Sequence, residues 1–261
     1  MRTLCQALGL EKNGVVSIVG AGGKTSLMFG LAHEISGSGQ TVLTTTTTKI
    51  MMPRKDQSCH VILTPSIQSL LDHARLLLKE NLHICAASPG LPEYPEKIVG
   101  FQKSFIDAVG QSGLFDWIIV EADGAAQKSL KVPAEHEPVI PLSSTYVIGV
   151  VGLNAIGKPL HPEWVFRHKR YASITGLSEG LPVTLDSVVR ATVHPEGIFK
   201  GSPPHAQKIL FLNTAGNPHQ LKNGRMLGET LLKAGVNHDI RRLVIGCPLE
   251  KETVIEGLDL I

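Results

Sequence analysis

A glycine-rich hexapeptide, Gly20-Ala21-Gly22-Gly23-Lys24-Thr25, constrains the fold of this chain more than any other feature of its sequence. The apolar run Val15–Val19 precedes it, and Ser26–Ile35 follows it with a pattern that predicts a helix. A glycine turn between a strand and a helix lets successive backbone N–H groups converge on phosphate oxygens, and the helix N-terminus and the lysine add positive charge. We therefore predict a phosphate-binding loop, with ATP or GTP as ligand.

The candidate nucleotide-binding residues of this loop share one short segment: Gly20, Ala21, Gly22, Gly23, Lys24, Thr25 and Ser26. The hydroxyl of Thr25 is expected to bind the Mg²⁺ that accompanies a nucleotide. We expect Lys24 to lie near the surface of the loop, where its replacement by alanine would cost phosphate affinity and leave the fold intact.

The loop departs from the longer phosphate-loop pattern, because Ile18 stands where that pattern has its first glycine. The shorter form, G-x-x-G-K-T, is similar to the loop of Mur ligases. A dinucleotide-binding turn, G-x-G-x-x-G, is a weaker interpretation. Its third glycine position is Thr25, and the second predicted strand region, Thr41–Lys49, ends without the carboxylate that would hold a ribose. A glycine turn without a ligand is the other alternative, and a lysine directly after the glycines disfavours it.

Composition sets the limits of the remaining interpretation. The chain has 261 residues, of which 43% are hydrophobic, and this is enough for a sizeable core. We expect a single α/β domain over 1–261, with a possible insertion or appendage within 153–207. The net charge of +2 gives no indication of a nucleic-acid groove or a basic membrane patch. Scattered cysteines and the lack of an apolar run of roughly 18 residues predict a cytoplasmic protein without a membrane partner.

Short apolar runs alternate with helical patterns along the chain. Strands are predicted at Val15–Val19, Thr41–Thr45, His60–Leu63, His83–Ala87, Trp117–Glu121, Thr145–Val151, Lys208–Asn213 and Arg242–Gly246. Helices are predicted at Lys24–Ser36, Ile67–Lys79, Lys97–Val109, Leu185–Thr192 and Gly224–Ala234. Several strands are continuously apolar, which is typical of strands buried on both faces of a parallel sheet. We therefore predict a three-layer α/β fold of the P-loop NTPase-like type, with a mostly parallel central sheet.

Two carboxylates follow one another at the end of the strand predicted at Trp117–Glu121. Glu121 and Asp123 are two residues apart, so on an extended chain they point to the same side. In phosphate-loop enzymes a strand of this kind brings a carboxylate to the metal. We predict that Asp123 binds Mg²⁺ together with Thr25, and that Glu121 helps to hold the metal or orients the attacking water. With Lys24 they are the predicted catalytic residues; a solvated strand end is the alternative.

Three further segments are candidates for the same edge of the sheet. Thr48 and Lys49 end the threonine run of the second strand and are predicted to contact metal-bound water and phosphate or substrate, although threonine also simply suits strands. Asn213 ends a late strand and is a candidate for contact with the nucleobase, although a turn role explains it as well. The proline-stiffened segment Lys128–Pro141 carries Lys131 and His136, which form either a substrate or switch element or a rigid loop with solvated charges.

Several segments spread over nearly the whole chain resemble the YqeC family. They are Val19–Thr25, Thr45–Lys49, Glu121–Gly124, Lys131–Pro141, Val151–Leu160 and Phe211–Asn213, and the P-A-E-H-E-P sequence is the most specific of them. The resemblance implies a phosphate-loop fold and an accessory role in the maturation of selenium-dependent molybdenum hydroxylases. The implied protein partner is a molybdenum hydroxylase or its cofactor-maturation machinery.

Three functions therefore remain open. The first is a cytoplasmic, Mg²⁺-nucleotide-dependent maturation factor in which hydrolysis drives cofactor transfer or a conformational cycle on a partner. The second is a small-molecule kinase or ligase, in the manner of dethiobiotin synthetase or Mur enzymes, with its acceptor near Lys49 and Lys131. The third is a non-catalytic protein that holds a phosphorylated cofactor such as a pterin dinucleotide. The loop has no evident arginine to stabilise charge in phosphoryl transfer, so slow basal hydrolysis is expected.

Overall fold

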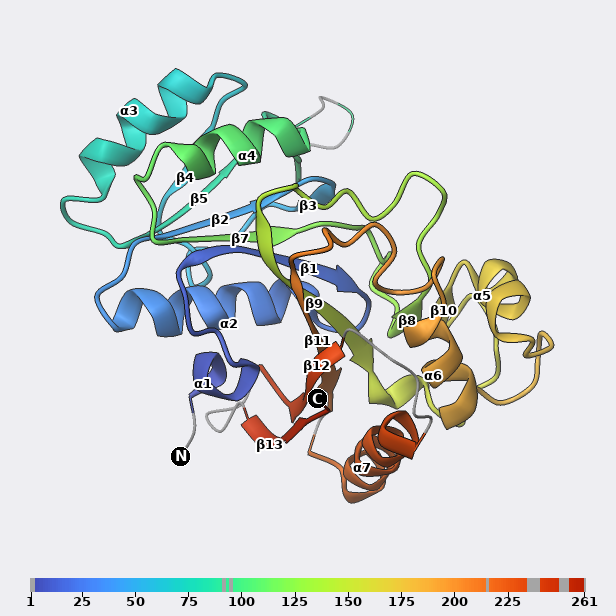
Figure 1. Ribbon diagram of the computed structural model, residues 1–261. Coiled ribbons are helices and arrows are strands. Elements are labelled where there is room, and N and C mark those ends of the chain that lie inside the picture. Colours follow the sequence, from blue (N-terminus) through green and yellow to red (C-terminus); the bar gives the residue numbers. More distant parts are fainter. Residues whose placement is uncertain are drawn as a thin grey trace.

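The computed structural model describes residues 3–90, 93, 96–214, 216–233, 240–248 and 254–260, and it shows a large sheet between helices (Figure 1). The sheet has nine strands in the order β13-β12-β11-β9-β1-β7-β2-β5-β4. In chain order these strands are β1 (Gly14–Gly20), β2 (Val42–Thr46), β4 (Val61–Leu63), β5 (His83–Ala87), β7 (Trp117–Glu121), β9 (Ser144–Gly152), β11 (Gln207–Asn213), β12 (Ile240–Gly246) and β13 (Val254–Asp259). Neighbouring strands are parallel except β12 and β13. The predicted mostly parallel α/β sheet is confirmed.

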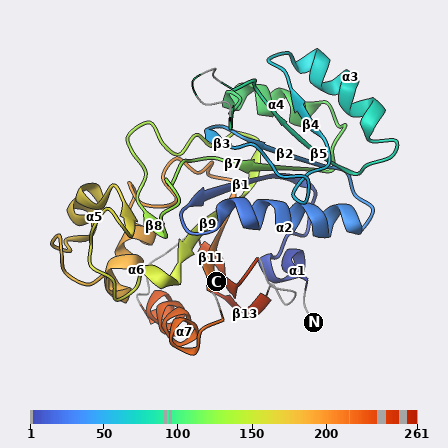
Figure 2. The same ribbon diagram turned by 180° about the vertical axis from the view of Figure 1, so that it is seen from behind.

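Helices cover both faces of this sheet, which gives the three predicted layers (Figure 2). On one face lie α1 (Leu4–Leu8) and α2 (Lys24–Gly37), and on the other α3 (Ile67–Leu77), α4 (Lys103–Gln111) and α7 (Pro218–Lys233). Beside α7 the chain forms η1 (Leu153–Ala155) and α6 (Leu185–Val193), and α5 (His168–Thr175) packs against α6. Within the described residues, no helix is long and apolar enough to cross a membrane.

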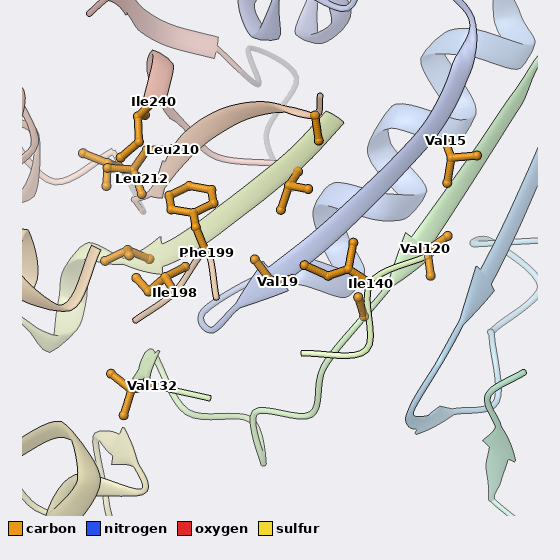
Figure 3. Close-up of a cluster of buried hydrophobic side chains, with 14 of the residues drawn as sticks. Val15, Val19, Val120, Val132, Ile140, Ile198, Phe199, Leu210, Leu212 and Ile240 are labelled. Carbon is orange, nitrogen blue, oxygen red and sulfur yellow. The ribbon is translucent and has the colours of Figure 1, made fainter. Parts of the chain in front are cut away.

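Burial on both faces of the sheet explains why several strands are almost continuously apolar. In β1, Val16 and Ile18 pack with α2 in one buried cluster, whereas Val15 and Val19 belong to the cluster on the opposite face (Figure 3). Because alternate side chains of a strand point to opposite faces, a strand covered on both sides favours apolar residues on both faces. Ser17, the polar residue of β1, is buried and shares a hydrogen bond of 2.8 Å with the hydroxyl of Ser144. The alternation of a half-exposed strand is therefore missing from the sequence of β1.

Two small sheets lie apart from the central one. In the first, β3 (Lys49–Met51) pairs with β6 (Lys97–Val99) in antiparallel fashion, and in the second, β8 (Leu130–Lys131) pairs with β10 (Val165–Phe166) in parallel fashion. The helix predicted at Lys97–Val109 is therefore wrong in its first part. Residues 97–99 form β6. Gly100 then packs against the backbone of Thr47, where a Cβ on Gly100 would lie 2.3 Å from the carbonyl carbon of Thr47. The chain turns there, and α4 begins only at Lys103.

The start of α7 was also predicted too late. The helix begins at Pro218 rather than Gly224, and proline is well suited to the first turn because it needs no N–H acceptor. Gly224 lies inside the helix, where a Cβ would approach Cδ1 of Ile245 to 2.8 Å. Glycine therefore allows α7 to pack closely on β12 and does not mark a helix end. The predicted final residue of this helix, Ala234, lies outside the described residues.

Candidate active site

The glycine-rich loop joins the end of β1 to the start of α2 and is packed tightly against its neighbours. Gly20, Gly22 and Gly23 have φ values of 89°, 88° and 119°, a region that favours glycine. A Cβ on Gly22 would lie 2.7 Å from the Cα of Gly152, and one on Gly23 would lie 2.3 Å from Nδ2 of Asn213. The ends of β9 and β11 thus leave room only for glycine at these positions.

The N–H groups of the loop fall into two sets. Gly20 donates its N–H to Oδ2 of Asp123 at 3.1 Å, and Ala21 donates to the carbonyl of Val150 at 2.9 Å. Within the part of the chain that the structure describes, no hydrogen bond uses the N–H groups of residues 22–26, and the same residues line a cavity. Backbone donors that lack a protein acceptor at a helix start are suited to an anion.

Lys24 is buried, which corrects the expectation that it lies near the surface. Its side chain is only 3% exposed, and Nζ donates to the carbonyl of Gly20 at 2.8 Å. Nζ also lies 3.2 Å from Oδ1 of Asp123 and 3.6 Å from Oε1 of Glu121. Burial lowers the pKa of Lys24, but the two carboxylates more than compensate and leave the pKa above its usual value. The lysine is therefore charged and forms part of the folded core.

The two predicted carboxylates meet this lysine and the loop. Oγ1 of Thr25 donates to Oε2 of Glu121 at 2.7 Å. Asp123 is 1% exposed, and its Oδ1 has no hydrogen-bond partner among the described residues, although it is close to the Lys24 amine. Burial raises the pKa of Glu121, and the nearby Lys24 offsets this only in part. The structure thus brings together Lys24, Thr25, Glu121 and Asp123 at the carboxyl edge of the sheet.

This set of oxygen atoms fits Mg²⁺. Mg²⁺ prefers oxygen ligands and is commonly held by one or two carboxylates together with substrate phosphates and water. Thr25, Glu121 and Asp123 offer a hydroxyl and two carboxylates, one of them with an oxygen that lacks a hydrogen-bond donor. Among the residues that the structure describes, no group of three or more His, Cys, Asp or Glu side chains could hold a metal by itself. Mg²⁺ at this position would take its remaining ligands from water or from the phosphate group of a ligand.

The charges continue beyond Asp123. Lys131 is fully buried, and its Nζ lies 2.9 Å from Oδ2 of Asp123 and 2.7 Å from Oε2 of Glu137. Arg167 binds Glu137 with two hydrogen bonds of 2.6 and 3.1 Å. Burial alone would raise the pKa of Glu137, but Arg167 and Lys131 lower it to about 2. We call this series the ion-pair chain; its members are Glu121, Lys24, Asp123, Lys131, Glu137 and Arg167.

The ion-pair chain corrects the interpretation of the proline-stiffened segment. Lys131 is a buried structural charge that also donates to the carbonyl of Gly124 at 2.6 Å, so it is unavailable to a substrate. His136, by contrast, is exposed. Arg167 was missed because nothing in the sequence connects it with Glu137. The segment Lys128–Pro141 shows only charged residues alternating with prolines, a pattern that is equally typical of a surface loop.

The remaining predicted residues have separate positions. Lys49 lines the cavity, whereas Thr48 donates its N–H to Oγ1 of Thr46 at 3.0 Å and is part of a backbone turn. Oγ1 of Thr46 in turn donates to the carbonyl of Glu121 at 2.8 Å, so this threonine binds the protein backbone. Nδ2 of Asn213 donates to the carbonyl of Gly22 at 2.6 Å. Asn213 therefore braces the loop, a role that the sequence did not indicate.

A cavity of about 760 Å³ opens in front of the loop. Its lining comes from the loop and α2, from the segment after β2, from β6 and from the segment after β7: Gly22–Ser26, Lys49–Met52, Arg54, Gln57, Lys97, Glu121 and Gly124–Ser129. It lies at the carboxyl ends of parallel strands, where ligands bind in open α/β sheets. A second cavity, of about 440 Å³, lies between η1 and the start of α7.

Comparison with known proteins adds to this geometry. The family described as YqeC protein matches residues 16–169. A relative from Escherichia coli (strain K12), named "Uncharacterized protein YqeC", is 37% identical over 242 residues, which are 92% of this chain and 90% of that protein. The chain belongs to the YqeC family. Every member of the ion-pair chain lies within the region that matches the YqeC family, whereas Asn213 lies outside it.

Proposed function

We propose that this protein binds Mg²⁺–ATP or Mg²⁺–GTP with the phosphates on the glycine-rich loop, and that it hydrolyses the nucleotide slowly. The observation that carries this proposal is the set of N–H groups at residues 22–26, which have no acceptor within the described structure and belong to residues that line a large cavity. The side chain of Lys24, which belongs to the same segment, adds a positive charge. Backbone donors, a helix start and a lysine together are the chemistry of phosphate binding.

In this proposal each side chain has a distinct task. Lys24 turns from the carbonyl of Gly20 towards a phosphate oxygen, and Thr25 and Asp123 hold Mg²⁺. When bound, Mg²⁺ neutralises charge that develops on the phosphates. Glu121 orients the attacking water, and its raised pKa suits it to accept a proton.

We also propose, on the family resemblance, that this nucleotide cycle acts in the cytoplasm during maturation of a selenium-dependent molybdenum hydroxylase. Among the described residues that line the large cavity, Arg54 is the one arginine, and it binds exposed Asp56 with two hydrogen bonds of 3.0 Å. A protein partner that supplies a further positive group would therefore accelerate hydrolysis. A non-catalytic cofactor-binding protein would use the same loop without any turnover.

The proposal is tested by ¹H–¹⁵N NMR and calorimetry. Titration with ATP or GTP in Mg²⁺ is expected to shift the amide resonances of residues 22–26 more than those elsewhere, and EDTA should weaken binding. AMP, which lacks the terminal phosphates, serves as the matched ligand control. Absence of binding at millimolar ATP and GTP, or shifts that spare the loop, would overturn the assignment.

A further inference from the structure

The large cavity extends beyond the loop to a wall made by a different part of the chain. We call this the β3–β6 wall and define it by Lys49, Met51, Met52, Arg54 and Lys97. Its first four residues follow β2, which pairs with β7 on the side away from β1. The wall therefore lies on the same side of β1 as Glu121 and Asp123, not on the side of β9 and β11.

The pairing of β3 with β6 decides which side chains this wall presents. Met51 pairs with Lys97, so the two side chains share a face, and Lys49 shares that face because it is two residues from Met51. Ile50 and its partner Ile98 occupy the opposite face and are buried at 6% and 0% exposure. The small sheet thus buries its aliphatic face and turns lysines and a methionine outward.

The lining of the cavity carries more basic than acidic side chains. Its basic lining residues are Lys24, Lys49, Arg54, Lys97 and Lys128, whereas Glu121 is the one acidic residue among the described lining. Lys24 belongs to the ion-pair chain, and the other basic residues belong to the wall or to the segment after β7. The pairs formed by Arg54 with Asp56 and by Lys97 with Glu96 are exposed and therefore weak. A concave surface with this excess of positive charge attracts anions.

The two methionines give the wall a second property. Met51 is 50% exposed and Met52 is 37% exposed, although both are apolar. Flexible thioether side chains adapt to ligands of varied shape, and binding pockets typically combine apolar surface with a few polar groups. The volume of about 760 Å³ is also in the upper part of the usual range of roughly 300–1,000 Å³ for ligand pockets.

These observations lead to one ligand class. The proposed Mg²⁺ ligands Glu121 and Asp123 lie on the β7 side of the loop, and the β3–β6 wall lies on the same side. In the proposed function, the terminal phosphate of a nucleotide would therefore lie on the side of this wall. We propose that this wall binds a second, small organic anion beside the terminal phosphate. Its carboxylate or phosphate group contacts Lys49 of the wall and Lys128 of the segment after β7, and its apolar body lies on Met51 and Met52. The placement of the two ligands relative to each other rests on the proposed function.

Methyl NMR of the protein labelled at methionine tests this proposal directly. The chain has five methionines, and Met226, 42% exposed on α7, reports on non-specific apolar binding. The probes are phenyl phosphate, benzoate and uncharged benzyl alcohol, each added with and without a non-hydrolysable ATP analogue and Mg²⁺. The two anions are expected to shift Met51 and Met52 but not Met226, benzyl alcohol should shift none, and the comparison of the anions identifies the preferred group.

Two sets of variants then test the charge contacts. The double variant Lys49→Gln/Lys128→Gln should bind the anionic probe about tenfold more weakly or worse. Lys79→Gln, at an exposed lysine in the turn after α3, is the matched control and should leave probe binding unchanged. An unchanged affinity in the double variant, or no shift of Met51 and Met52 with any probe, refutes the proposal.

The two proposals fail in different ways. If the ATP analogue displaces the probe, the wall holds the nucleoside and the second ligand is refuted. If calorimetry shows no nucleotide binding but the probe still shifts Met51 and Met52, the organic-anion site stands and the proposed nucleotide function fails.

Discussion

At the scale of single residues, Asp123 is the point where two buried lysines meet. Its Oδ1 faces Lys24 and its Oδ2 faces Lys131, while the N–H of Gly20 also donates to Oδ2. Removing one member of a buried ion pair leaves its partner without compensation, which costs more than the pair contributes. Each charge in this cluster therefore supports the fold as well as any chemistry.

Lys24→Met should consequently destabilise the protein by about 3 kcal/mol, because Glu121 and Asp123 then lose their shared cation. Urea unfolding at neutral pH measures the loss, with Lys79→Met as the exposed-lysine control. The variant should also bind nucleotide roughly 30- to 150-fold more weakly, since it lacks one charge-assisted phosphate contact. Wild-type stability would mean that the lysine is not held as a buried charge.

A second residue-scale prediction concerns the metal. Asp123→Asn and Thr25→Ala should both reduce the Mg²⁺ dependence of nucleotide binding more than they reduce binding in EDTA, because both side chains are proposed metal ligands. Asparagine keeps the shape of Asp123, and Asp56→Asn is an exposed control. Calorimetric titrations with and without Mg²⁺ distinguish the effects. If Asp123→Asn keeps the full Mg²⁺ dependence, Glu121 is the better metal candidate.

At the scale of elements, His83 lies where α2 contacts β5, and its pKa is below the usual value for histidine. His83 packs against the rings of Phe29 and His33, and its Nε2 lies 3.0 Å from Oγ1 of Thr44. Burial, and to a smaller extent the positive charge of His33, lowers the pKa of His83 to about 4. The folded protein thus keeps His83 neutral at a pH where the unfolded chain protonates it.

This contact should lose stability in mild acid. Because the pKa is lower in the folded state, the contribution is complete above about pH 6.5 and is lost as the pH falls towards 4. Between pH 7.5 and 4.5 we expect the wild type to lose about 2.5 kcal/mol more than His83→Gln, at about 1.4 kcal/mol per pKa unit. Urea unfolding midpoints at the two pH values measure this difference. His73→Gln, at an exposed histidine of α3, is the control. Parallel losses in all three proteins would contradict it.

The elements also show what could be predicted from the sequence. Strands such as β5 and β7 were predicted with their observed bounds because buried apolar runs dominate their sequences. The pairing of β3 with β6 was not predicted because each strand has only three residues. The sequence around Lys97 is equally compatible with the start of a helix. Glu121 and Asp123 follow a clear strand, so their position beside the loop could be predicted. The partner of Glu137 could not, because Arg167 is brought near only by the tertiary fold.

At the scale of the whole molecule, three of the described arginines, Arg54, Arg167 and Arg170, are bound by other groups of the protein. Arg167 binds Glu137, and Arg170 donates to the carbonyl of Pro133 and to Glu196. Arg54 borders the cavity but pairs with Asp56. If the protein binds a nucleotide as proposed, none of these three arginines is placed to stabilise the charge of phosphoryl transfer, for which an arginine is worth about 10³–10⁵ in rate.

Steady-state hydrolysis of ATP or GTP by the purified chain should therefore be far slower than about 10 per second, a typical enzyme rate. If the proposed role in maturation is correct, addition of a molybdenum hydroxylase or its maturation proteins should raise the rate. Lys24→Met serves as the control for contaminating hydrolases, because it should abolish any genuine turnover. A rate near 10 per second without a partner would instead favour a self-sufficient enzyme.

The ion-pair chain constrains how this sequence can change during evolution. Its six charges alternate in sign and cancel, from Glu121 at one end to Arg167 at the other. A single exchange anywhere along it leaves a buried neighbour uncompensated. Descendants of this chain should therefore keep the six residues as one inherited unit or lose several of them together, even where some members never touch a ligand.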